Sequence, residues 1–386
     1  MPAKDLDKET PPTEPHPEHG GGEVNEPSRF HIDLPQFVQT ETQLPTAKPL
    51  RPVNDRAAPP RGFRETLKAA AKDWRVKGSI QKVLGVVPGG HTIHQQLQRR
   101  IGGLASFASE CDLKIEDWRL MMEHLTAARM PVQHASLLEM GSGWYPTFPV
   151  CLYLSGAQQI LTIDLTRLMD PALTVAMVER LGEHLAMIAS LSRRPEGDVR
   201  ASHAQLLAAL REGKSIGAAT NLTIDYRAPY DASSTAFLPS TFDVVFSNSV
   251  LEHVPPPLID ASFAESMRIL RPGGVMFHSV NCGDHYAYTD STINQLHYLA
   301  YSDEAWQFWN NEFLYQNRLR AQDFTERAQK AGFTIELDTS RPHPDRLAQL
   351  EKIVVHERFA GYPRTQLAIT SIDFIGRKPA APDPGN

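Results

Sequence analysis

The sequence predicts an α/β fold: a doubly wound, mostly parallel sheet with an N-terminal helical cap and a disordered N-terminal tail. From residue 134 onward, short apolar runs alternate with segments of helical periodicity, the pattern of parallel strands joined by right-handed helical crossovers. Two closely spaced glycines follow the first apolar run. The first 60 residues hold 12 of the 30 prolines and show no periodicity, so they cannot bury enough surface to offset the entropy of ordering.

Bulk composition limits the classes of protein. The 386 residues, 41% hydrophobic and 22% charged, are typical of a soluble globular chain with one large domain or two. A net charge of -6 argues against a nucleic-acid partner. Three isolated cysteines disfavour a disulfide framework or a structural zinc site. No apolar run suits a membrane span or a signal peptide, so we expect a cytoplasmic protein; its oligomeric state stays open.

Four regions follow from these patterns. We expect a disordered tail at 1–60, a helical cap at 61–133, the main domain at 134–378 and a short disordered tail at 379–386. The histidines of "HPEHGGG" in the first tail could bind a metal, although a solvated linker is the favoured reading. Helical periodicity within the cap is carried by "FRETLKAAAKDWRVKGSIQKVL", "IHQQLQRRIGGL" and "IEDWRLMMEHLTAARM".

Strands and helices alternate along the main domain. The predicted strands are "ASLLEM", "QILTIDL", "TNLTIDY", "FDVVFSN", "VMFHSV", "FTIELDTS" and "QLAITSIDFIGR". The predicted helices are "TFPVCLYLSG", "PALTVAMVERLGEHLAMIASL", "AQLLAALREG", "PPLIDASFAESMRIL" and "AQDFTERAQKAG", with "RPGG" as a turn before the fifth strand. The insertion at about 281–319 is long, polar and aromatic, which is typical of a lid or a substrate wall.

The stretch "LLEMGSGWYP" indicates a ligand site. Gly141 and Gly143 follow a buried strand, where ligands approach the backbone in such sheets. Asp164 ends the next strand about twenty residues later, where an acid would hold the two hydroxyls of a ribose. Bulky residues replace the third glycine of a dinucleotide fingerprint. The pattern therefore favours a ligand with adenine and ribose but without phosphate.

Several spaced motifs resemble the class I S-adenosylmethionine-dependent methyltransferases over roughly residues 134–375. "LLEMGSGWYP" matches the first motif of that family, and Asp164 matches its ribose-binding acid. "DASSTAFLPSTFDVVFSNSVLEHV" and "RILRPGGVMFHSV" match later motifs in the right order. The resemblance implies a Rossmann-like sheet and S-adenosyl-L-methionine as the cofactor.

The same resemblance implies roles at the methionine end of the cofactor. Gly141 and Gly143 would pass under the methionine part, and Glu139 would lie near its amino group. Asn248 would offer its backbone carbonyl to that amino group.

At the adenosine end, the resemblance implies that Asp164 holds the ribose. Asp231 would bond the adenine amino group, and Ala232 would donate a backbone N–H to the ring. "SSTAF" departs from the family pattern, so Asp225 remains a rival for the adenine contact.

Histidines supply candidate bases for the reaction. His285, in the loop after the fifth strand, is the first candidate, with Asp284 holding its ring in one tautomer. His253 in "LEHV" is the second, whereas Glu252 is read as a residue favoured at a helix N-terminus. A metal bound by Asp284, His285 and Asp290 is conceivable, but a local hydrogen-bond cluster is favoured and no metal is predicted.

These observations predict methyl transfer to an oxygen or nitrogen atom of a small-molecule or glycan-type acceptor. A methyltransferase-like protein that binds cofactor or partner without turnover is the main alternative. An NAD(P)-dependent oxidoreductase is a weaker one, because no tyrosine has a lysine four residues on. Arg318 and Arg320 could hold an anionic substrate or pair with nearby acids.

Overall fold

The computed structural model describes residues 73–76, 78–79, 104–310 and 315–380, with side chains omitted at 104–106. The chain divides into two compact units, 1–55 and 56–386, and all described residues belong to the second. The predicted tail at 1–60 with its "HPEHGGG" motif, most of the helical cap before residue 104, and residues 381–386 of the second tail lie outside the described residues.

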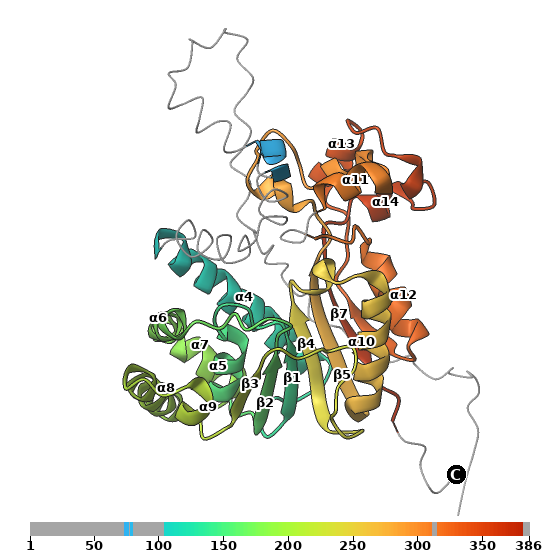
Figure 1. Ribbon diagram of the computed structural model, residues 1–386. Coiled ribbons are helices and arrows are strands. Elements are labelled where there is room, and N and C mark those ends of the chain that lie inside the picture. The colour runs from blue at the N-terminus through green and yellow to red at the C-terminus, as the bar shows by residue number, and fades with distance from the viewer. Residues whose placement is uncertain (1–72, 77, 80–103, 311–314, 381–386) are drawn as a thin grey trace, which may run out of the picture. The chain divides into compact units, whose positions relative to one another are not determined.

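A single sheet organises the described part of the chain (Figure 1). Its strands follow the order β3-β2-β1-β4-β5-β7-β6; β7 is antiparallel to both of its neighbours and the other pairs are parallel. This arrangement confirms the predicted doubly wound, mostly parallel sheet. The strands are β1 (Ser136–Met140), β2 (Gln159–Ile163), β3 (Ile224–Arg227), β4 (Phe242–Asn248), β5 (Leu270–Asn281), β6 (Thr334–Asp338) and β7 (Ser371–Arg377).

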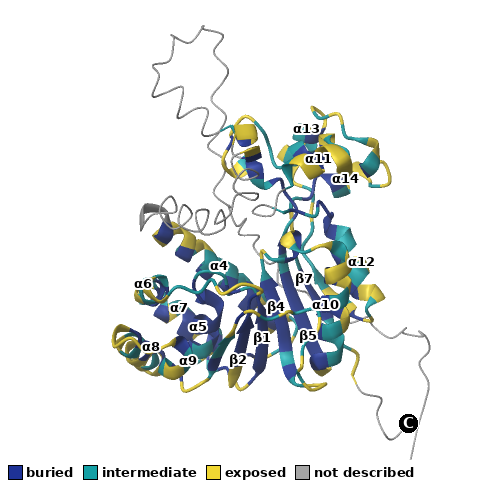
Figure 2. Cartoon of the chain, viewed as in Figure 1, coloured by how far each residue is buried: buried dark blue, intermediate teal, exposed yellow. Residues whose placement is uncertain are grey.

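Helices cover both faces of this sheet, whose strands are largely buried (Figure 2). Successive residues point to opposite faces: Leu137 joins one apolar cluster and Leu138 the other. On the Leu137 face lie α4 (Leu104–Ala127), α5 (Thr147–Leu154), α6 (Pro171–Leu181), α7 (Leu185–Ser192), α8 (Glu196–Arg211) and α9 (Ile216–Ala219). On the Leu138 face lie α10 (Pro256–Ile269) and α12 (Ala321–Lys330).

Two predicted elements differ from the structure. The long helix expected over "PALTVAMVERLGEHLAMIASL" is two helices, α6 and α7, because the chain breaks at Gly182–His184. Glycine has a low helix propensity, and the break lets both helices bury apolar residues in one cluster. The predicted "RPGG" turn lies within β5, where Gly273 has a φ of +78° and the pairing with β4 shifts register.

A third apolar cluster, which we call the lid, lies beyond the end of β5 (Figure 1). The predicted insertion supplies η2 (His285–Tyr288), η3 (His297–Ala300) and α11 (Asp303–Trp309). The connection between β6 and β7 adds α13 (Pro344–Leu350), η4 (Glu357–Phe359) and α14 (Arg364–Leu367), a contribution that the sequence did not predict. None of the helices in the described ranges has the length and apolarity needed to cross a membrane.

Candidate functional site

The candidate site lies at the carboxyl edge of the sheet, where the strand order reverses between β1 and β4. Gly141 leaves β1 with a φ of +87°, and its N–H donates to the Ile163 carbonyl at 2.8 Å. A Cβ built on Gly141 would lie 2.5 Å from Cγ2 of Val250, in the turn after β4. Glycine is therefore required here both by backbone conformation and by close packing.

Gly143 lies opposite Asp164, the acid that ends β2. The Gly143 N–H donates to Asp164 Oδ1 at 3.4 Å. A Cβ on Gly143 would meet no atom within 4 Å, so the loop borders open space. Asp164 Oδ2 is buried and has no hydrogen-bond partner of regular geometry in the described part of the chain. Burial raises the pKa of Asp164 to about 6, against the opposing effect of the Gly143 N–H.

Glu139 is the buried acid of β1. Its Oε2 accepts hydrogen bonds from Ser142 Oγ at 2.6 Å and from Thr162 Oγ1 at 2.5 Å. Burial raises the pKa of Glu139 to about 7, although both hydroxyls oppose this shift. A cationic group placed beside this carboxylate would favour its ionised form, as the amino group of an amino-acid ligand would.

Helix α4 contributes two charged residues that sequence reasoning missed. Lys114 Nζ lies 4.5 Å from the centroid of the Tyr145 ring, and its charge acts on both Glu139 and Asp164. Asp117 Oδ2 accepts a hydrogen bond from Asn248 Nδ2 at 3.1 Å, and burial raises the pKa of Asp117 to about 6. Their i, i+3 spacing on a helix with apolar neighbours was the available signal.

The segment expected at the adenine lies beside the end of β2. The Tyr230 N–H donates to the Asp164 carbonyl at 2.9 Å, which brings the following Asp231 and Ala232 to this edge. Asp231 is exposed, and its carboxylate caps Ser233 through the backbone N–H at 2.8 Å. The rival Asp225 is paired within β3, where its carboxylate lies 2.8 Å from Arg227.

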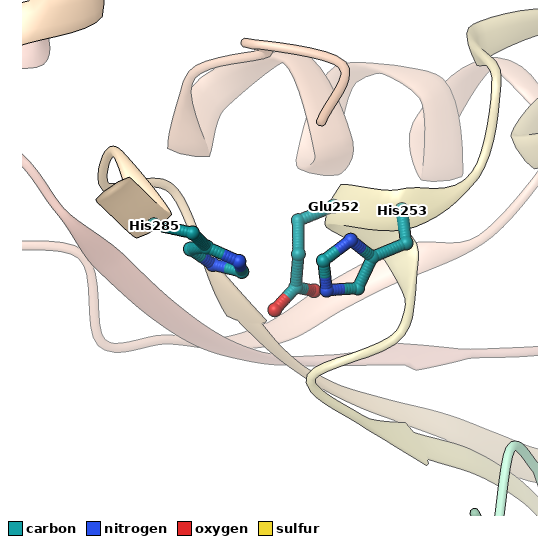
Figure 3. A group of neighbouring side chains, drawn as sticks. All are labelled: Glu252, His253 and His285. Carbon is teal, nitrogen blue, oxygen red and sulfur yellow. The ribbon is translucent and has the colours of Figure 1, made fainter. Parts of the chain in front are cut away.

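His253 and His285, the two candidate bases, come together at the ends of β4 and β5. Their ring centroids are 5.0 Å apart at an interplanar angle of 66°. Glu252 completes the group: one ligand atom from each of the three residues lies within 4.8 Å of the others. Figure 3 shows the side chains converging, two from the turn after β4 and one from η2. We call Glu252, His253 and His285 the EHH cluster.

Burial affects the two adjacent residues of the EHH cluster differently. Glu252 is 1% exposed, and burial raises its pKa to about 8. It is therefore a buried acid of the pocket rather than the solvated helix-start residue expected from sequence. His253 is exposed as a residue, but partial loss of hydration lowers its pKa. The Tyr315 carbonyl accepts a hydrogen bond from His253 Nδ1 at 2.7 Å.

Asp284 does not orient His285, contrary to the sequence-based expectation. Its carboxylate lies 2.8 Å from His297 Nδ1 and caps the Tyr286 N–H. Asp290 accepts from the Trp74 N–H at 3.0 Å and caps Thr292. The metal group considered from Asp284, His285 and Asp290 is therefore not assembled, since both carboxylates serve the lid.

Arg318 and Arg320 also serve the lid. Arg320 is fully buried and donates to the Cys282 carbonyl at 2.8 Å and to the Tyr298 hydroxyl at 2.6 Å. Arg318 donates to the Tyr298 carbonyl at 3.0 Å and pairs with Asp303. Both guanidinium groups are thus engaged within the protein, which favours the structural reading over an anionic substrate.

Comparison with known proteins gives the following matches. Residues 122–337 match a family described as "Methyltransferase domain". Among curated proteins, none matches the sequence. A methyltransferase structure from Mesorhizobium loti is 14% identical, with 66% of this chain and 96% of that chain covered and a TM-score of 0.36. The [4+2]-cyclase SpnF is 16% identical (68% and 82%, TM-score 0.38), and geranyl diphosphate methyltransferase in complex with its cofactor is 14% identical (72% and 92%, TM-score 0.38).

Proposed function

Because the chain belongs to the methyltransferase-domain family, of the class I S-adenosylmethionine-dependent type, we propose that it methylates an oxygen or nitrogen atom of a small-molecule or glycan-type acceptor. S-adenosyl-L-methionine is the cofactor that this family implies. It supplies a methyl group already activated by a sulfonium, so the protein mainly aligns nucleophile, carbon and sulfur.

The observation that carries the cofactor assignment is the carboxylate of Asp164 beside Gly143. Its Oδ2 is buried without a regular hydrogen-bond partner in the described ranges, and the loop opposite borders open space. A ribose hydroxyl would satisfy this oxygen, since buried acceptors without partners are costly. The residues present therefore fit a nucleoside ligand. Glu139 and Asn248 are the residues that would hold its amino-acid end, with Lys114 near enough to attract a carboxylate.

The acceptor assignment rests on the EHH cluster. A hydroxyl or amine nucleophile must lose a proton around the time of methyl transfer, and imidazoles accept protons near neutral pH. His253 and His285 supply two such rings at the carboxyl edge, in the turns that follow β4 and β5. Val250, packed against Gly141, connects this turn to the cofactor loop. A carbon nucleophile or an already ionised oxygen would not need such a pair.

Transfer of labelled methyl groups tests this proposal. The full chain should be incubated with methyl-labelled S-adenosylmethionine and fractionated metabolite and glycan extracts, with Asp164→Ala as the matched inactive variant. We expect label in one small-molecule or glycan fraction, lost with the variant. Label confined to protein or nucleic acid would overturn the acceptor class. Cofactor binding without transfer to any fraction would favour the non-catalytic alternative.

A further inference from the structure

The Glu252 carboxylate is buried at an opening of the protein. The residue is 1% exposed, and neither side-chain oxygen has a hydrogen-bond partner of regular geometry within the described ranges. The adjacent His253 is nevertheless exposed and His285 is half-buried, so the group can be reached from solvent. An unsatisfied buried carboxyl group is costly unless something that binds there compensates for it. Its position between two imidazoles narrows what that ligand can be.

The tautomer of His253 leaves one ring nitrogen available. Its Nδ1 lies 2.7 Å from the Tyr315 carbonyl, which can only accept a hydrogen bond, so Nδ1 carries the proton. Nε2 then has a lone pair. Donation of one imidazole N–H to a backbone carbonyl is the arrangement that orients histidine ligands in metal sites.

Three successive residues hold the members of the EHH cluster. Tyr315 accepts from His253, as above, and Gln316 Oε1 accepts from the His285 backbone N–H at 3.3 Å. The Asn317 N–H donates to the Glu252 carbonyl at 2.9 Å. Asn317 Nδ2 also donates to the carbonyls on either side of this turn, at Leu251 (2.7 Å) and Val254 (2.9 Å).

This segment therefore fixes the two turns that carry the cluster, one after β4 and one after β5. Such support limits the reorganisation that binding requires. Two imidazole nitrogens and one carboxylate oxygen are the ligands that divalent transition metals take, often with an open position for water or substrate. A metal bonded at about 2.1 Å holds tetrahedral ligand atoms roughly 3.4 Å apart, so the side chains, now within 4.8 Å, would move inward slightly.

We infer that Glu252, His253 and His285 form a binding site for one divalent transition-metal ion of the Zn²⁺ or Mn²⁺ type, facing the acceptor side of the pocket. The inference rests on the proposed function for its role: the ion's open position would bind the acceptor oxygen or nitrogen and favour its deprotonation. No redox change is involved, and the proton leaves to solvent or to a group of the acceptor.

Metal binding by itself tests the site. The full chain is stripped with chelator, dialysed and titrated calorimetrically with ZnCl₂ and with MnCl₂. His16→Ser/His19→Ser serves as the background variant, because those tail histidines could bind metal independently. We expect one equivalent of Zn²⁺ in both proteins, with affinity reduced about a hundredfold or more in Glu252→Gln and in His285→Ala. Co²⁺ bound at the site should give visible d–d absorption bands that Glu252→Gln abolishes.

Several outcomes would overturn the inference. These are absence of stoichiometric binding, undiminished binding in folded Glu252→Gln, or loss of binding in the tail variant alone. Thermal melts confirm folding of each variant, and His285→Ala gives an independent result if Glu252→Gln is unstable. A parallel titration with S-adenosylhomocysteine separates the two claims. Binding of that nucleoside without metal refutes the metal site alone, whereas its absence refutes the proposed function.

Discussion

The Gly143 N–H lies 3.4 Å from Asp164 Oδ1, so the loop after β1 meets the acid at the end of β2. The carboxylate is thereby turned toward the loop, while its other oxygen stays without a regular partner among the described residues. Residues 21 positions apart in the sequence thus form one ligand-binding edge. The predictions below start from this pair and move outward to the acceptor side.

Asp164→Ala should weaken S-adenosylhomocysteine binding by roughly 1.5–3 kcal/mol, the range for hydrogen bonds to a charged group. The melting temperature should change little, because Asp164 Oδ2 has no regular partner to lose in the described part of the chain. Asp225→Ala is the matched control, since that carboxylate pairs with Arg227 within β3. Calorimetry of both variants checks this. Equal loss in both, or none in Asp164→Ala, would place the ribose elsewhere.

Gly141→Ala should destabilise the protein by roughly 2–4 kcal/mol, combining left-handed backbone strain with overpacking. The added methyl group would lie 2.5 Å from a Val250 methyl group. Val250→Ala should therefore recover part of the loss in the double variant, which urea unfolding would measure. Gly143→Ala is the control for backbone strain alone, because its Cβ would meet open space. Strictly additive losses for Gly141 and Val250 would rule out the contact.

Glu139 should make the stability of the ligand-free protein depend on pH. Its pKa is raised by burial from 4.5 to about 7, so its stabilising contribution is complete below about pH 4.5 and is lost as pH rises through about 7. Relative to Glu139→Gln, the wild-type protein should lose on the order of 3 kcal/mol of unfolding free energy across that window. Urea unfolding at a series of pH values measures the difference. Parallel pH profiles would show that Glu139 is ionised throughout.

His285→Ala should lower turnover by roughly a hundredfold or more and leave cofactor affinity intact, since the ring acts on the acceptor. His253→Ala should behave alike, because the two rings lie 5.0 Å apart in one cluster. His343→Ala, at an exposed turn, is the control. Single-turnover assays with the identified acceptor compare the three variants. Full activity of the His285 variant would remove it from the mechanism and leave η2 as part of a substrate wall.

Much of the fold was predictable because the sheet has a strong local signal. Strands buried on both faces appear as apolar runs, and β4 was predicted with the bounds that the structure has. The break between α6 and α7 was missed because Gly182 interrupts an amphipathic pattern without changing its period. The lid was half predicted: its second segment, between β6 and β7, joins the first only through long-range packing.

The site divides in the same way. Gly141, Gly143 and Asp164 are close to strand ends, so topology alone brings them together. Lys114 and Asp117 lie on a helix that precedes the sheet, and nothing in their local pattern shows which strand edge that helix crosses. Asp284 was paired with its neighbour His285 by proximity in sequence, whereas tertiary packing pairs it with His297.

Calorimetric titration of the full chain with S-adenosylhomocysteine, and separately with NAD, tests the central claim most directly. Glu139, Gly143 and Asp164 provide for an amino-acid end and a ribose, while the residues after Gly143 lack the third glycine that a pyrophosphate needs. We predict stoichiometric binding of S-adenosylhomocysteine, weakened by Asp164→Ala, and no binding of NAD. Binding of NAD without binding of S-adenosylhomocysteine would contradict the account.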